Sequence, residues 1–370
     1  MSTYAGDPAW HVTGYEAVSR LLADARLGRT HPHPDRAPRY SNSVMFGRPQ
    51  PATPTEAADH ARMRRLLTPW FSPARMAGMR RRVQELVDLV LDDLASQTAP
   101  ADFHEAVSFP LPALVICELL GVPYEDRERF RRWSDDAADM GDEARSRSGL
   151  GALWHYMVEL VDTKRRRPGE DVLSYLIAAQ QGEGTASATD DVAMVGAALL
   201  FAGHETTVAA IDKGVVLLAT RPGLGDALRG DPALVEPAVE EILRLPLPVP
   251  TGDGGRAGLP RWAKADVEID GAVIRAGELV LLDIQAANLD PRIYGSAEAL
   301  DVRRSDKPHL AFGRGPHFCL GAPLARMELH VLVTALVRRW PTLEPAVPVE
   351  ELRPRNHLLT GGLHALPVRW

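Results

Sequence analysis

The sequence has very little cysteine: only Cys117 and Cys319 occur in 370 residues. Two cysteines cannot build a disulfide framework, so a disulfide-stapled fold is excluded and a reducing cytoplasm is expected. Cys117 lies in the apolar run ALVICELLG, and we interpret it as a core residue because free cysteines are commonly buried. Cys319 is therefore the cysteine that is free for chemistry.

Long hydrophobic runs and a basic excess are also missing. The longest apolar stretch, residues 192–202, falls short of the roughly 20 residues that span a bilayer. The start, MSTYAGDPAW, has neither the basic region nor the apolar region of a signal peptide. The formal net charge of −7 argues against nucleic acid or an anionic membrane as the main partner.

Helical periodicity dominates the remaining sequence. Strand-like segments are few: residues 9–15, the pair 266–270 and 271–276 around an Asp-Gly turn signal, and residues 358–370. Two long irregular loops, 30–54 and 245–261, are rich in proline or glycine. We predict a mainly α, single domain over 1–370 with small sheets. Its helices are expected at 55–70, 74–97, 105–120, 124–139, 150–167, 171–182, 189–219, 231–245 and 320–339.

The densest motif is the segment 312–321, FGRGPHFCLG, which directly precedes a helical pattern. Its glycines permit positive φ and close approach of backbone N–H groups to the sulfur of Cys319. The positive end of the following helix would stabilise a thiolate. A thiolate suits ligation of haem iron, where it favours O–O cleavage. The alternative is a buried cysteine in a glycine-rich turn.

This loop resembles the haem-binding loop of the cytochrome P450 family, Phe-Gly-x-Gly-x-His-x-Cys-x-Gly. The resemblance runs from about Ala9 to Trp370, although most bacterial members open with a further helix and strand. It implies a P450-type fold that holds haem b between the long central helix and the cysteine-loop helix. Cys319 would be the iron ligand, and Phe312, Gly313 and Gly321 would shape the cofactor site.

The segment AGHETT in the helix at 189–219 matches the acid–alcohol pair of that family. The resemblance implies that Ala202 and Gly203 leave room for dioxygen. Thr206 would hydrogen-bond the dioxygen, and Glu205 would feed a proton relay. His204 does not begin a zinc HExxH motif, because the residue four positions later is valine. The alternative is that these residues form an ordinary solvated polar stretch of a helix.

Haem carries two propionates, which need cationic partners. Four residues match family positions for this role, namely His60, Arg64, Arg261 and His317. The alternative for each is a surface or ion-pair residue.

A Glu-x-x-Arg pair, Glu241 and Arg244, shares one helix face and by resemblance joins Arg304 in a structural lock. We assign this set no catalytic role.

The resemblance implies a monooxygenase that uses dioxygen to hydroxylate or epoxidise a small organic substrate in the tailoring of a secondary metabolite. The alternatives are an oxidative ring-coupling enzyme and a non-catalytic haem protein. The GDGG stretch at 252–255 lacks the spacing and context of a dinucleotide site, so electrons are expected from a ferredoxin and its ferredoxin reductase. We expect a cytoplasmic monomer on which ferredoxin docks at a face holding Arg62, Arg64, Arg65 and Arg314.

Overall fold

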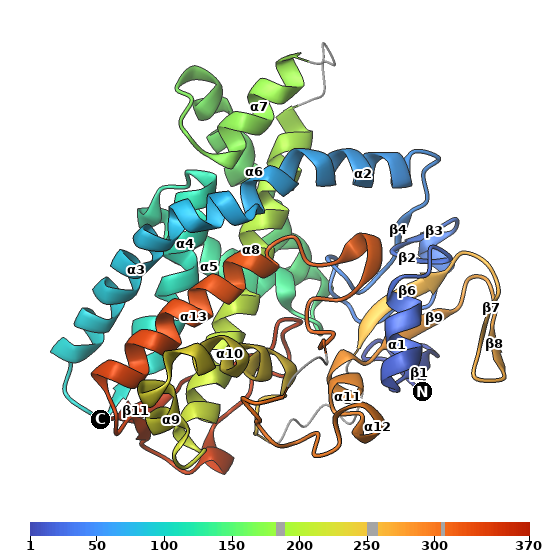
Figure 1. Ribbon diagram of the computed structural model, residues 1–370. Helices are drawn as coiled ribbons and strands as arrows, with labels where there is room; N and C mark the ends of the chain where they lie inside the picture. Colours follow the sequence, from blue (N-terminus) through green and yellow to red (C-terminus); the bar gives the residue numbers. More distant parts are fainter. Residues whose placement is uncertain (183–188, 250–257, 305–307) are drawn as a thin grey trace.

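Figure 1 shows the computed structural model, which describes residues 1–182, 189–249, 258–304 and 308–370. Helix α8 (Thr189–Ala219) runs through the middle of the helical part. By length and composition it could pass for a membrane-spanning helix. It is a core helix instead, because many other helices contact it, among them α4 (Pro110–Leu120), α6 (Glu143–Arg166), α7 (Val172–Gly182), α10 (Val235–Arg244) and α13 (Ala322–Arg339).

The remaining long helices enclose this core. Helix α3 (Pro73–Ser96) begins where the Ser72 side chain accepts a hydrogen bond from the Arg75 N–H, and it packs on α13 and α4. Helix α2 (Glu56–Leu67) leads into it, and α5 (Arg127–Ala138) lies on α6. A π-helical turn, η3 (His104–Ser108), precedes α4. The predicted helices are thus confirmed, with small shifts at most of their ends.

The predicted start of α6, at residue 150, is wrong by two turns. The helix begins at Glu143, after Asp142 accepts a hydrogen bond from the Arg145 N–H. Gly149 and Gly151 hide this part of the helix from sequence reading, since glycine disfavours helix interiors. Gly149 is required here because a Cβ atom would lie 2.5 Å from the carbonyl oxygen of Trp133 on α5.

The main sheet joins the two ends of the sequence. Its order is β1 (Trp10–Val12), β9 (Leu279–Leu282), β6 (Leu259–Ala263) and β2 (Leu27–Gly28), with β1 parallel to β9 and the other pairs antiparallel. Helices α1 (Tyr15–Leu22) and α11 (Ile284–Asn288) contact each other beside it. The strand predicted at 9–15 is therefore short, and the sequence reading missed α1, β6 and β9.

The predicted hairpin is confirmed. Strands β7 (Val267–Ile269) and β8 (Ala272–Ile274) pair antiparallel, and Asp270 and Gly271 turn at φ values of 49° and 80°. The strand expected over 358–370 is limited to β11 (Pro367–Arg369), which lies between β10 (Glu344–Pro345) and β5 (Ala101–Asp102). In loop 30–54, β3 (Thr30–His31) pairs with β4 (Gln50–Pro51). The GDGG stretch falls outside the described residues.

Other short helices were also missed by sequence reading: α9 (Leu224–Gly230) and α12 (Pro291–Tyr294). The segment that leads into α13 passes between the helical part and the sheet part, near the middle of the view in Figure 1. This arrangement places the cysteine loop where the two parts meet.

Candidate active site

The cysteine loop is a tight backbone structure. Gly313 and Gly315 adopt φ values of 71° and 74°, and the Cys319 N–H donates to the Phe312 carbonyl at 2.8 Å. At Gly315 a Cβ atom would lie 2.8 Å from the Cα atom of Ala23, so a larger residue would push the loop away from the end of α1. The glycines therefore allow both the backbone turn and the close packing of the loop against the end of α1.

Cys319 lies just before α13, which begins at Ala322. Burial raises the pKa of its thiol, while the N–H groups of Gly321 and Ala322 lower it. The sulfur is enclosed by protein on most sides, yet the residue keeps accessible surface because it opens onto a cavity. A thiol held this way stays protonated unless a metal cation binds it, and metal coordination deprotonates a thiol outright.

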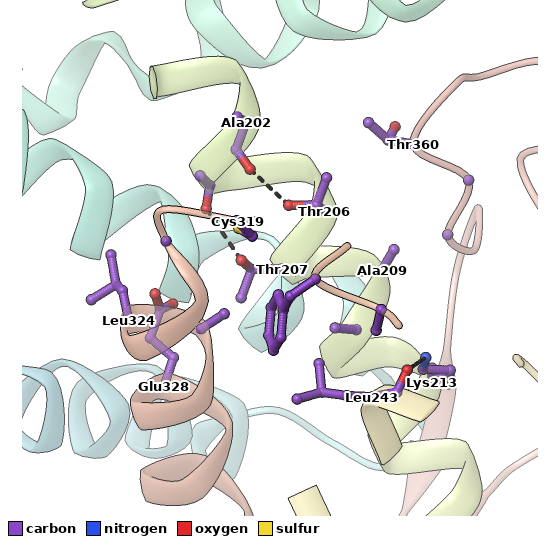
Figure 2. A pocket seen from close by; sticks show the side chains of 18 of the residues that line it. Ala202, Thr206, Thr207, Ala209, Lys213, Leu243, Cys319, Leu324, Glu328 and Thr360 are labelled. Carbon is purple, nitrogen blue, oxygen red and sulfur yellow. Dashed lines mark hydrogen bonds between the residues drawn. The ribbon is translucent and has the colours of Figure 1, made fainter. Parts of the chain in front are cut away.

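A cavity of about 530 Å³ lies between parts of α8 and α13. Cys319 faces it from one side, and Ala202 and Thr206 face it from the other (Figure 2). Its volume lies within the range of small-molecule and cofactor pockets. The wall is mainly apolar and includes Phe71, Ile116, Leu199, Leu243, Leu247, Phe312 and Leu324.

The predicted acid–alcohol segment divides over two faces of α8. The Thr206 hydroxyl donates to the Ala202 carbonyl at 2.7 Å and lies in the cavity, whereas Glu205 is buried on another face. Gly203 lines the cavity beside α4, where a Cβ atom would lie 2.8 Å from Ile116 Cδ1. The absence of a side chain at Gly203 therefore makes room for Ile116 of α4 and also enlarges the cavity.

Basic side chains, two imidazoles and several guanidinium groups, gather beside the cysteine loop. The imidazole rings of His60 and His317 lie 4.3 Å apart, centroid to centroid. Burial, together with His60, Arg261 and Arg29, lowers the pKa of His317 to about 4. Burial and the nearby Arg29 likewise lower the pKa of Arg261 to about 10. The sequence reading missed Arg29 because no motif marks it.

Arg64 joins the same neighbourhood, since its guanidinium donates to the Phe318 carbonyl at 2.9 Å. Within the described part of the chain, the carboxylate that offsets the repulsion among these basic groups is Glu56, but it already accepts hydrogen bonds from Lys264 at 2.9 Å and Thr30 at 2.7 Å. The group thus keeps an excess of positive charge. Such a group is stabilised by an added anion, and two carboxylates would suit it.

These features fit a haem. An apolar gap between two helices suits the ring, a cysteine sulfur faces that gap, and a cationic group without sufficient counter-charge suits the propionates.

Comparison with known proteins decides the family. The cytochrome P450 family model matches residues 151–361. Pentalenolactone synthase of Streptomyces exfoliatus is 43% identical over 367 residues, which cover 98% of this chain and 91% of that protein. This chain belongs to the cytochrome P450 family.

Solved P450 structures share its fold. PimD, the epoxidase of the polyene macrolide antibiotic pimaricin, matches with a TM-score of 0.84 and 38% identity, over 100% of this chain and 92% of that chain. P450mel 107F1, which has biaryl coupling reactivity, matches with a TM-score of 0.84 and 35% identity, over 98% and 90%. This P450 is a haem-dependent monooxygenase that binds iron protoporphyrin IX and uses dioxygen, an organic substrate and redox partners.

Glu205, next to Thr206 on α8, belongs to a buried polar network on the other face of the helix. Its Oε2 atom lies 3.4 Å from Arg355 Nη1, and Arg355 also pairs with Asp135 on α5. Burial and Asp135 raise the pKa of Glu205 to about 7, against the opposing effects of Arg355 and His104. A carboxyl group with a pKa near neutrality can both accept and release a proton. The Asp135 side chain is 24% exposed, so the network reaches solvent.

The Glu241–Arg244 pair is buried and fully engaged. Arg244 Nε and Nη2 contact the two carboxylate oxygens of Glu241 at 2.6 and 2.8 Å. Arg244 also donates to the carbonyls of Asn288 at 2.9 Å, Ala297 at 2.6 Å and Ala299 at 3.0 Å. Arg304 Nε lies 3.3 Å from Glu241, so the three predicted partners meet. Through Asn288, whose side chain accepts from the Leu310 N–H at 2.7 Å, the set holds the segment before the cysteine loop.

Sequence reading missed two ionisable residues that line the cavity, Lys213 on α8 and Glu328 on α13. Lys213 could have been found from the sequence, because a lysine within the apolar stretch of a core helix is unusual and indicates a site. Glu328 lies two turns beyond the loop on a helix with many charged residues, so its pattern does not distinguish it from a surface acid.

Proposed function

We propose that Cys319 is the axial ligand of the haem iron. The observation that carries this proposal is the position of its sulfur, which faces the cavity opposite Thr206 while the N–H groups of Gly321 and Ala322 stabilise its negative charge. Phe312, Gly313 and Gly321 shape the loop around it. Cys117 is buried in α4, where burial raises the pKa of its thiol to about 12, so it is a poor ligand.

The propionates of the haem are held by His60, Arg64, Arg261 and His317, with Arg29 as an additional partner. These residues carry more positive charge than Glu56 offsets, and carboxylates would relieve the repulsion among them. Arg64 reaches the loop through the Phe318 carbonyl, which leaves its remaining N–H groups for a carboxylate.

When bound, haem supplies the centre at which dioxygen and electrons combine and one oxygen atom is inserted into the substrate. The Thr206 hydroxyl, beside the cavity, would turn its one O–H from the Ala202 carbonyl to dioxygen, and Ala202 and Gly203 leave space there. Glu205 transfers protons to this end of the cavity, and Arg355 and Asp135 connect Glu205 to solvent. Ordered proton delivery of this kind directs electrons into product and away from peroxide.

The substrate is a small organic molecule in the tailoring of a secondary metabolite. Residues of the loop 30–54 and of the C-terminal turn line a second cavity, of about 360 Å³, which shares Gln285, Asn356, Thr360 and Gly361 with the first. These segments would select the substrate. Oxidative ring coupling is the second candidate, because P450mel 107F1 shares the fold and couples biaryls.

The chain acts as a single haem-thiolate domain over 1–370, a cytoplasmic monomer that receives electrons from a ferredoxin and its reductase. The docking face includes Arg65 on α2 and Arg314 in the cysteine loop. Arg314 donates to the Ser19 hydroxyl at 2.5 Å, and Arg65 is exposed. An acidic ferredoxin would be attracted to these charges.

The ligand assignment is tested by the absorption of the reduced protein with carbon monoxide. The wild type and Cys117→Ser should show the red-shifted Soret band of a thiolate-ligated haem, and Cys319→Ser should lose it. A band that survives in Cys319→Ser and is lost in Cys117→Ser would contradict the assignment. Thermal unfolding of both variants checks that they fold.

A further inference from the structure

Lys213 is an ammonium group at one end of the cavity. It lies seven residues after Thr206 on α8, on the same helical face and about 10 Å further along the axis. The residue lines the cavity, as Figure 2 shows together with Leu243. Its one hydrogen bond in the described part of the chain goes from Nζ to the Leu243 carbonyl at 3.3 Å, close to the end of α10.

No carboxylate of the described residues forms an ion pair with Lys213. Of the described residues that line the cavity, only Glu328 is acidic, and Figure 2 shows it on α13, across the cavity from Lys213. Burial lowers the pKa of Lys213 to about 8 and raises the pKa of Glu328 to about 8. At neutral pH the amine is therefore largely charged and the acid largely neutral, so the described residues that line the cavity carry one cation without a counter-charge.

A purely structural role explains this arrangement poorly. Lys213 could serve as a cap for the end of α10, where a cation interacts favourably with the helix dipole. That interaction is small compared with the cost of removing an ammonium group from water, and one long hydrogen bond does not replace its three donors. A buried charge of this kind is normally paired.

We propose that Lys213 binds a carboxylate of the substrate, so that this P450 takes organic acids. The proposal rests on the proposed function, since it concerns the same cavity. The acid group of the substrate would lie at the end of the cavity next to α10, and the carbon to be oxidised would lie nearer Thr206. The distance between Lys213 and Thr206 along α8 would therefore select substrates in which the carboxylate and the oxidised carbon are similarly spaced. A haem propionate is the other source of a carboxylate in this cavity, although the cationic group at His60 and Arg261 already provides for the propionates.

The test uses the haem-loaded protein and two probes of equal chain length, dodecanoate and dodecanol. Their dissociation constants are measured by calorimetry and by the spin-state shift of the ferric haem. The variants are Lys213→Met, which keeps the length of the side chain without its charge, and the control Lys164→Met. Lys164 pairs with Asp171 at 2.6 Å and does not line the cavity.

We expect the wild type and Lys164→Met to bind dodecanoate more tightly than dodecanol. Lys213→Met should weaken dodecanoate binding about ten- to hundred-fold, the size of a lost charge-assisted hydrogen bond, and leave dodecanol binding unchanged or tighter. Haem retention should be unchanged.

Three outcomes would overturn the proposal: no preference for the acid in the wild type, an equal loss for both probes in Lys213→Met, or faster haem loss with an unchanged acid-to-alcohol ratio. The last outcome would assign Lys213 to a propionate. A lower melting temperature with an unchanged ratio would assign it to the α10 cap and would also refute the proposal. Failure of the haem-thiolate assignment itself is seen separately, as loss of the carbon monoxide band in the wild type.

Discussion

Replacement of Arg244 by methionine tests whether the buried Glu241–Arg244 pair holds the cysteine loop. The change would leave Glu241 as a buried carboxylate, with Arg304 Nε at 3.3 Å as its remaining cationic partner. Breaking a buried ion pair in this way costs about 3–5 kcal/mol. It would also leave the carbonyls of Asn288, Ala297 and Ala299 without the Arg244 donors, and each such loss costs about 1 kcal/mol or more.

The total, roughly 6–8 kcal/mol, is comparable with the whole stability of an ordinary domain, about 5–15 kcal/mol. We therefore expect Arg244→Met to fold poorly and to retain little haem. The assay is urea unfolding together with the haem content of the purified protein.

Two variants serve as controls for Arg244→Met. Arg303→Met removes an exposed arginine from the neighbouring segment and should behave as the wild type. Glu241→Gln should lie between the two, since Arg244 keeps its three carbonyl acceptors. The reasoning would be refuted if Arg244→Met loaded fully with haem and lost less than about 2 kcal/mol of its free energy of unfolding, because that loss is smaller than the cost of breaking one buried ion pair.

Three further predictions concern catalysis, pH and electron delivery. Thr206→Ala should keep electron consumption while product falls and peroxide rises, and unchanged product per NADPH would remove Thr206 from the relay. Well below pH 4.5, Glu328 is protonated in both the folded and the unfolded chain. Between pH 4.5 and its folded pKa of about 8, only the unfolded chain releases the proton. The free energy of unfolding therefore falls by up to roughly 1.4 kcal/mol per pH unit in this range. Urea midpoints of Glu328→Gln should therefore lack part of the decline that the wild type shows between pH 5 and 8, and parallel curves would contradict the burial of an ionisable Glu328. Reduction by a ferredoxin should slow with salt and in Arg65→Glu but not in Arg275→Glu, an exposed arginine directly after β8. A rate insensitive to both salt and charge would exclude electrostatic docking.

Much of the fold could be predicted from sequence because it depends on local periodicity. The helix at 189–219 and the Asp270-Gly271 hairpin are set by short-range patterns, and both are confirmed. The start of α6 could not be predicted, because Gly149 is explained only by the closeness of α5. Strands β6 and β9 were also missed, since their pairing joins residues far from β1 and β2 in the chain.

The cysteine loop shows how much of a site can be predicted from sequence. The motif at 312–321 by itself permitted the positive φ values of Gly313 and Gly315 and determined the place of Cys319 before α13, because these depend on the loop's own residues. The closeness of Gly315 to Ala23 came only with the tertiary structure. The tertiary structure alone decided which charges meet there. The repulsion between Arg29 and Arg261 arises between segments more than two hundred residues apart.

The same division holds at the cavity. The order Glu205-Thr206 is plain in the sequence, and helix geometry alone puts adjacent side chains on different faces. Only helix packing decides that the hydroxyl meets the cavity and the carboxyl meets Arg355. Lys213 and Glu328 line the same cavity only because α8 and α13 face each other. Burial then sets their pKa values, and burial is a property of the assembled helices, which the sequence of neither helix contains.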